Sequence, residues 1–136
     1  MKKSAFKFTA PTTTKLEFEI NKGFAKGQTV EMRMDISVQI EQNDTDHEIP
    51  ENTARVSITL VLGEKNDTAP FYVEAVEEAY FRWESDRFTE EERKVLLEKN
   101  AVSLLISYLR PIVSGITAAS PYPAYNIPYV DLTAND

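Results

Sequence analysis

The last quarter of the sequence joins an apolar helical segment directly to a segment that cannot be helical. Residues 89–118 carry apolar side chains at helical spacing in two adjacent stripes, which together cover most of the helix circumference. A helix of this kind needs a partner on more than one side. We therefore expect one stripe to pack on a sheet of the same chain and the other to join copies of the chain. The stripe assigned to this oligomer interface consists of Val102, Ile106, Leu109 and Val113.

The helix has a clear start signal and one internal irregularity. Thr89 and Glu92 have the spacing of a capping box, in which each side chain accepts a hydrogen bond from the other residue's backbone N–H. Farther along, Pro111 has no N–H to donate to the carbonyl of Ser107 and crowds it. We expect a kink there, at a cost on the order of 3 kcal/mol that packing offsets.

Residues 119–136 are predicted to form an extended tail, because closely spaced prolines separate its tyrosines. Aromatic rings bury a large apolar area at low cost in side-chain entropy, so they suit the binding of varied apolar ligands. The alternative is that the tail packs back on its own sheet and its rings are core, and the sequence leaves both open. The candidate peptide-binding aromatics are Phe24, Phe81, Trp83, Tyr122, Tyr125 and Tyr129.

Before the helix, apolar and polar residues alternate in the manner of half-buried strands. The alternating segments are residues 15–20, 30–42, 55–62 and 70–83. A break in the last one, at Glu77 and Glu78, predicts a bulge. Residues 1–13 are expected to be an arm or an edge strand. Strands followed by a helix favour a single α+β domain over residues 1–136, with a four-stranded antiparallel sheet covered on one face by the long kinked helix.

Composition excludes several classes of function. A net charge of −7 and a sequence pI near 4.8 argue against nucleic acid as a partner, because phosphate-binding surfaces are basic. The absence of cysteine excludes disulfides, thiol catalysis and thiolate metal sites. We find no signal-peptide pattern and no window that approaches the roughly 20 apolar residues of a membrane span. The expectation is a cytoplasmic protein without membrane insertion.

The residues that most often carry chemistry do not form a convincing site. His47 lies in a charged turn, and the sequence has no second histidine to complete a transition-metal shell. Glu77 and Glu78 are adjacent in a strand and so point to opposite faces. The four glycines fit no phosphate-binding pattern. We therefore expect no catalytic residues, no metal and no cofactor.

Several short motifs, in the same order and at similar spacing, resemble those of SecB, the bacterial export chaperone. Family members carry a strand ending in Ser-Phe-Glu, a Leu-Gly-Glu hairpin turn, a helix core with Tyr and Arg, and a tail of aromatic-Pro, Asn-aliphatic and Pro motifs. The resemblance covers roughly residues 14–132. The corresponding segments here are Leu16–Glu19, Leu62–Glu64, Ser107–Arg110, Tyr122-Pro123, Asn126-Ile127 and Pro128–Leu132.

The resemblance implies a Greek-key sheet with a crossover at Asn21–Thr29 and a homotetramer built as a dimer of dimers through the helices. It also implies docking of the export motor ATPase on the exposed sheet face. Of the docking positions, Glu19, Leu62 and Glu64 are kept, whereas Lys15 stands where the family carries an acid.

The function implied by the resemblance is ATP-independent, non-enzymatic binding of non-native polypeptides by a homodimer or homotetramer. A second hypothesis is an adaptor that keeps the fold but recognises one specific protein partner. The third is a small-molecule or enzymatic role at the crossover, which would require a closed pocket with convergent polar groups.

Overall fold

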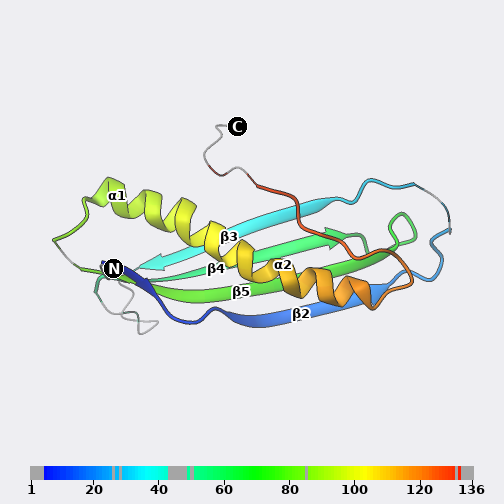
Figure 1. The fold of residues 1–136 in the computed structure, drawn as a ribbon, viewed down its shortest axis with the longest axis horizontal. Coiled ribbons are helices and arrows are strands. Elements are labelled where there is room, and N and C mark those ends of the chain that lie inside the picture. Colours follow the sequence, from blue (N-terminus) through cyan, green and yellow to red (C-terminus); the bar gives the residue numbers. More distant parts are fainter. Residues whose placement is uncertain are drawn as a thin grey trace.

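The computed structural model describes residues 5–25, 27, 29–42, 49, 51–84, 86–130 and 132. In these residues an antiparallel sheet carries a long helical rod across one face (Figure 1). The strands are β1 (Phe6–Phe8), β2 (Thr12–Ile20), β3 (Met34–Gln42), β4 (Thr53–Gly63) and β5 (Phe71–Trp83). The rod consists of α1 (Glu90–Val95), a π-helical segment η2 (Leu96–Ala101) and α2 (Val102–Ala118).

The sheet has a Greek-key order. β3, β4 and β5 pair in succession, and β2 returns to pair with the far side of β5. The α+β class, the antiparallel sheet and the helix on one face are confirmed. The sheet has five strands where four were predicted, because Phe6–Phe8 also pairs with β5, opposite Phe81–Trp83. The connection from β2 to β3 crosses between the two edges of the sheet at one end (Figure 1).

The predicted bulge in the last strand is wrong. β5 pairs with β4 without interruption, and the irregularity lies on the opposite neighbour, between Thr13 and Lys15 of β2. The sequence alternation breaks for another reason: Glu77 is an acid on the face that points to the core, where it is 2% exposed. Its carboxylate accepts a hydrogen bond from Thr13 Oγ1 at 2.6 Å, which provides the partner that a buried carboxylate requires.

The core lies between the rod and the two central strands. The inward residues of β4 are fully buried, and those of β5 nearly so. Burying each such aliphatic side chain stabilises the fold by about 1.5–3 kcal/mol, so this layer supplies most of the apolar contribution. The inward residues of β4 are Ala54, Val56, Ile58, Leu60 and Leu62.

The stripe assigned to an oligomer interface faces the protomer's own sheet instead, so that assignment is wrong. The four side chains are buried in the core cluster within a single protomer and have no surface left for a second copy. The sequence shows two stripes but does not say which one the sheet covers. The buried residues are Val102, Ile106, Leu109 and Val113.

The rod begins as predicted, with Thr89 and Glu92 forming a complete capping box. Its departure from regular α-helix lies at Leu96–Ala101, and α2 stays helical through Pro111 to Ala118. A π-helical turn holds more residues than an α-turn, so it rotates the later residues around the axis. The apolar stripe can therefore stay on the sheet while the rod crosses it.

By length and composition alone, the helix Glu90–Ala118 could cross a membrane, with a mean hydropathy of 1.4 in its most apolar window. The expectation that no stretch approached a span was therefore wrong on those two criteria. In the protein this helix packs one face against β4 and β5, which is the arrangement of a core helix.

Gly63 provides a test of the hairpin that joins β4 to β5. Its φ is +80°, and a Cβ there would lie 2.0 Å from the carbonyl oxygen of Phe71. We expect Gly63→Ala to lower the free energy of unfolding by more than about 2 kcal/mol. Gly115→Ala is the matched control: it meets nothing within 4 Å and lies in a helix, so it is expected to be neutral or stabilising. Urea unfolding of both variants measures the difference, and equal stabilities would contradict this account.

Candidate binding surface

An open apolar groove lies where the crossover meets the tail. Its volume is about 380 Å³. One wall comes from the crossover and the start of β5, and the other from the tail. The residues that line it are Phe24, Gly27, Thr29, Val30, Met32, Pro70, Phe71, Tyr122, Pro123, Ala124 and Tyr125. We call it the crossover–tail groove.

Asn21 fixes the crossover wall of the groove. Its side-chain amide donates to the carbonyl oxygens of Glu64 at 2.6 Å and Ala69 at 2.9 Å, so it ties the crossover to the β4–β5 hairpin. Gly23 allows the two segments to approach, because a Cβ there would lie 2.4 Å from the carboxylate of Asp67. The carbonyl of Asn21 also accepts from the N–H of Phe24, which sets the ring's position.

Hydrogen bonds to α2 fix the tail wall. Thr117 is fully buried, and its hydroxyl oxygen accepts from the N–H of Tyr125 at 2.8 Å. Farther along, Arg110 donates through Nη2 to the carbonyl oxygen of Pro128 at 3.1 Å. Between these two points Ile127 is 6% exposed and belongs to the core. The tail is therefore docked on its own protomer and at the same time forms part of an open surface.

Three of the six candidate aromatics come together at this groove. Phe24 and Tyr122 meet edge to face, with ring centroids 5.8 Å apart, and Tyr125 lies beside them in the lining. Phe24 is 6% exposed, whereas both tyrosines are half-buried against the core. Tyr129 is 84% exposed and does not line the groove. The tail thus combines the two alternatives, because its rings pack on the core and also line an open surface.

Phe81 and Trp83 do not belong to this surface. They are 1% and 4% exposed and lie at the far end of β5, opposite β1. Phe81 stacks with Phe6, and Arg93 lies over the indole ring of Trp83. Their assignment as peptide-binding residues is wrong: they alternate inward along a strand whose inner face the rod covers, so they are core.

The exposed sheet face keeps only part of the predicted docking set. Leu62 is fully buried on the opposite face and cannot contact a docking partner, so that assignment is wrong. Glu19 is exposed opposite Tyr72, next to the hairpin that begins at Gly63 and Glu64. Glu19 and Glu64 therefore lie at the same end of this face.

Ion pairs neutralise much of the acid on that face. Lys15 pairs with Glu74, whose carboxylate also accepts from the Tyr72 hydroxyl at 2.8 Å. Lys65 pairs with Glu17 at 3.0 Å and lies over the Tyr72 ring. The hydrogen bond from Lys15 lowers the pKa of Glu74, while burial and then the bond to Glu74 raise the pKa of Tyr72 to about 12. The lysine at the position where the SecB family carries an acid thus pairs within the sheet.

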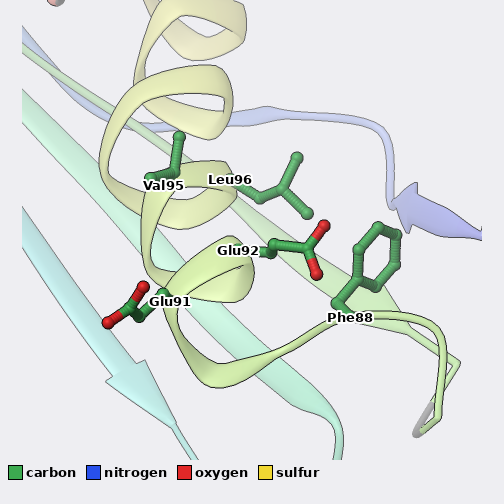
Figure 2. Close-up of a pocket in the computed structure, with 5 residues that line it drawn as sticks. All are labelled: Phe88, Glu91, Glu92, Val95 and Leu96. Atoms are coloured by element: carbon green, nitrogen blue, oxygen red, sulfur yellow. The ribbon is translucent and has the colours of Figure 1, made fainter.

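A second hollow, of about 440 Å³, lies at the start of the rod (Figure 2). Phe88, Glu92 and Leu96 point to one side, whereas Glu91 and Val95 lie on the other side of the helix. The carboxylate of Glu92 already accepts from the Thr89 N–H in the capping box. This hollow is open and mostly apolar, so it lacks the convergent polar groups that would favour an enzyme or a small-molecule site.

Within the described residues, no three His, Asp or Glu side chains gather as metal ligands. His47 and its charged turn lie outside those residues. Glu77 and Glu78 face opposite sides of β5, and Glu77 is engaged by Thr13, so they do not form a carboxylate pair.

No family model and no curated protein sequence matches the chain. Its fold is similar to that of the SecB-like chaperone Rv1957 of Mycobacterium tuberculosis, solved in complex with a ChAD peptide from the Rv1956 HigA1 antitoxin. The TM-score is 0.71 at 14% sequence identity, covering 92% of this chain and 90% of that chain. A protein of unknown function from Streptococcus agalactiae matches with a TM-score of 0.49 at 11% identity, over 91% of this chain and 97% of that one. The chain has a SecB-like fold.

The ion pair between Lys15 and Glu74 makes a prediction about acid stability. The folded pKa of Glu74 lies below its ordinary value of 4.5, so its contribution is complete above that pH and is lost as pH falls through the folded pKa. We expect Glu74→Gln and Lys15→Met each to reduce the fall in unfolding free energy below about pH 4.5. Urea unfolding across a series of acid pH values measures this slope. An unchanged slope in both variants would refute the assignment.

Proposed function

We propose that this protein binds segments of other polypeptides at the crossover–tail groove, without catalysis and without ATP. The observation that carries the proposal is an open, mostly apolar groove walled by Phe24, Tyr122 and Tyr125. Rigid aromatic walls contact apolar side chains of many shapes at low entropic cost. The SecB-like fold supports the same reading, since one protein with that fold is a chaperone solved with a bound peptide.

Two forms of this function differ in the range of polypeptides that are bound. A chaperone of non-native chains binds many unrelated apolar segments and so prevents their aggregation. An adaptor binds one partner, and the neighbour's complex with a peptide from a named antitoxin favours keeping this alternative. A link to protein export would need Glu19 and Glu64 to dock a motor protein, and it is the weaker part of the proposal because Leu62 is buried.

Self-association is the second part of the proposal. From residue 100 to residue 118 the only charged residue is Arg110, which bonds to the tail. The outward face of α2 presents Tyr108, which is 41% exposed, together with the half-buried Leu104. An exposed helix face without charges is typical of an interface. We propose that α2 pairs copies of the chain through this face rather than through the stripe predicted from the sequence.

Client binding at the groove is tested by a pair of tyrosine substitutions. Tyr122→Ala removes a groove wall and is expected to weaken binding of unfolded client proteins by about tenfold, the effect of losing a central aromatic contact. Tyr129→Ala is the matched control, because this tail tyrosine lies outside the groove. Light scattering of several unrelated aggregating clients, with stoichiometric amounts of each variant, measures the effect.

The result separates the two forms of the function. Suppression of aggregation for several clients, lost in Tyr122→Ala, supports the chaperone. No suppression, together with one stable partner whose binding Tyr122→Ala abolishes, supports the adaptor. Equal behaviour of the Tyr122→Ala and Tyr129→Ala variants would refute binding at the groove.

The interface on α2 is tested by placing a charge on its outward face. Tyr108→Glu is expected to shift the protein from an oligomer to a monomer, because burying an unpaired carboxylate costs several kcal/mol. Ser103→Glu adds the same charge at an exposed position on the same helix, away from Tyr108, and is expected to leave the oligomer intact. Sedimentation velocity at high micromolar concentration measures the masses, and a monomeric wild-type protein would contradict the proposal.

A further inference from the structure

The two edges of the sheet differ in how they are protected against pairing with another strand. β2, at one edge, has an irregular register between Thr13 and Lys15, and Lys15, Glu17 and Glu19 lie along its outer face. Bulges and edge lysines are the usual devices that prevent a strand from adding to an edge. β3, at the other edge, pairs with β4 over nine residues in an unbroken register. Its sequence, MDISVQIEQ, contains no lysine, proline or glycine.

The ladder between β3 and β4 determines which backbone groups of β3 face outward. The N–H of Gly63 donates to the carbonyl oxygen of Arg33 at 2.9 Å, so these two residues form a hydrogen-bonded pair. In an antiparallel ladder such pairs alternate, so the N–H and C=O groups of Asp35, Ser37, Gln39 and Glu41 bond to β4.

The residues between them therefore direct their backbone groups away from the sheet. The outward N–H and C=O groups belong to Met34, Ile36, Val38 and Ile40. No hydrogen bond reaches these groups from any residue that the structure describes. Their side chains lie on the apolar face beneath the rod, where Val38 is 42% exposed. This edge thus offers a row of free backbone groups next to an uncovered apolar side chain.

We propose that the free edge of β3 accepts an extended segment of a bound polypeptide as an added strand. The inference rests on the proposed function and specifies the conformation of the bound segment. Main-chain hydrogen bonds give such strand addition an affinity that does not depend on sequence, and alternate side chains give it selectivity. A groove for a few side chains and a nearby strand edge together suit a long extended client.

The two faces of β3 define the chemistry of the added strand. On the helix side its side chains would lie beside Ile36, Val38 and Ile40, so apolar residues fit there. On the open side they would lie beside Asp35 and Glu41, and the chain as a whole has a net charge of −7. Opposite charges across neighbouring strands are favourable, so lysine or arginine fits there. The predicted client segment alternates apolar with basic or polar residues.

A second copy of the chain fits this edge poorly. The antiparallel register that pairs all nine residues of β3 with those of another β3 places Asp35 opposite Glu41 twice. Like charges directly opposite each other destabilise a strand pair. The edge is thus better matched to a basic strand of another protein than to itself.

The inference is tested with a labelled ten-residue peptide in which valine alternates with lysine and threonine. Two isomers carry the same number of backbone N-methyl groups, one on the valines and the other on the lysines and threonines. N-methylation removes the donors on one edge of the peptide only. We expect one isomer to lose at least about tenfold in affinity while the other binds like the unmethylated peptide. For an antiparallel added strand, the valine-methylated isomer is the one that loses.

Two edge substitutions and hydrogen exchange locate the peptide. Val38→Lys places a charge on the free edge and is expected to lose at least about tenfold in peptide affinity. Leu16→Lys is the matched control on the opposite edge, since Leu16 is 45% exposed, and it is expected to bind normally. In hydrogen exchange followed by NMR, the amides of Ile36, Val38 and Ile40 should exchange fast in the free protein and slowly in the complex. Those of Asp35 and neighbouring ladder residues should be slow in both.

The outcomes separate this inference from the proposed function. Equal binding of both methylated isomers, or unchanged exchange at Val38 on peptide binding, overturns strand addition even if Tyr122-dependent client binding persists. Slow exchange at Val38 in the free protein that speeds up on dilution assigns the edge to a second copy and also overturns the inference. If neither the peptide nor any client binds, the inference and the proposed function both fail.

Discussion

Burial of the inner faces of β4 and β5 under the helical rod is the contact on which the rest of the structure depends. The inward side chains of β4 lose all contact with water, and Leu109 and Val113 of α2 close over the layer. The rod crosses this face rather than covering it (Figure 1). The end of the sheet beside the crossover is therefore left to the crossover and the tail, and the groove lies where these two irregular segments meet. The open surface is thus a consequence of one helix packing on a sheet wider than itself.

Much of the fold was predictable because it is local. Alternation with a period of two located the strands, and Thr89 with Glu92 located the start of the rod. What failed was the assignment of faces: Val102 and Leu62 are apolar residues in regular elements, and their spacing alone does not say which side is covered. Asn21 was missed for a different reason. Its importance comes from two carbonyl oxygens more than 40 positions away in the sequence, which no local pattern signals.

The tail shows why a sequence can leave core and binding surface unresolved. Tyr122 and Tyr125 pack against the core and also line the groove, while Tyr129, with similar neighbours in sequence, is exposed. The difference comes from the hydrogen bonds of Thr117 and Arg110, which hold the tail at two points along its length. Sequence identified the right kind of residue here, and tertiary anchoring selected which residues take part.

The distribution of charge matches a division of labour between the two faces of the sheet. On the helix-free face, lysines pair with acids such as Glu17 and Glu74, so charge there is mostly spent within the protein. On the helix-bearing face, the exposed groups at the β3 edge and in the groove are apolar or are uncharged backbone. Apolar contacts and main-chain hydrogen bonds do not discriminate among side chains, whereas fixed charges do. A surface built from the first two fits a protein that holds varied extended segments, and the acids beside the β3 edge add a preference for basic ones.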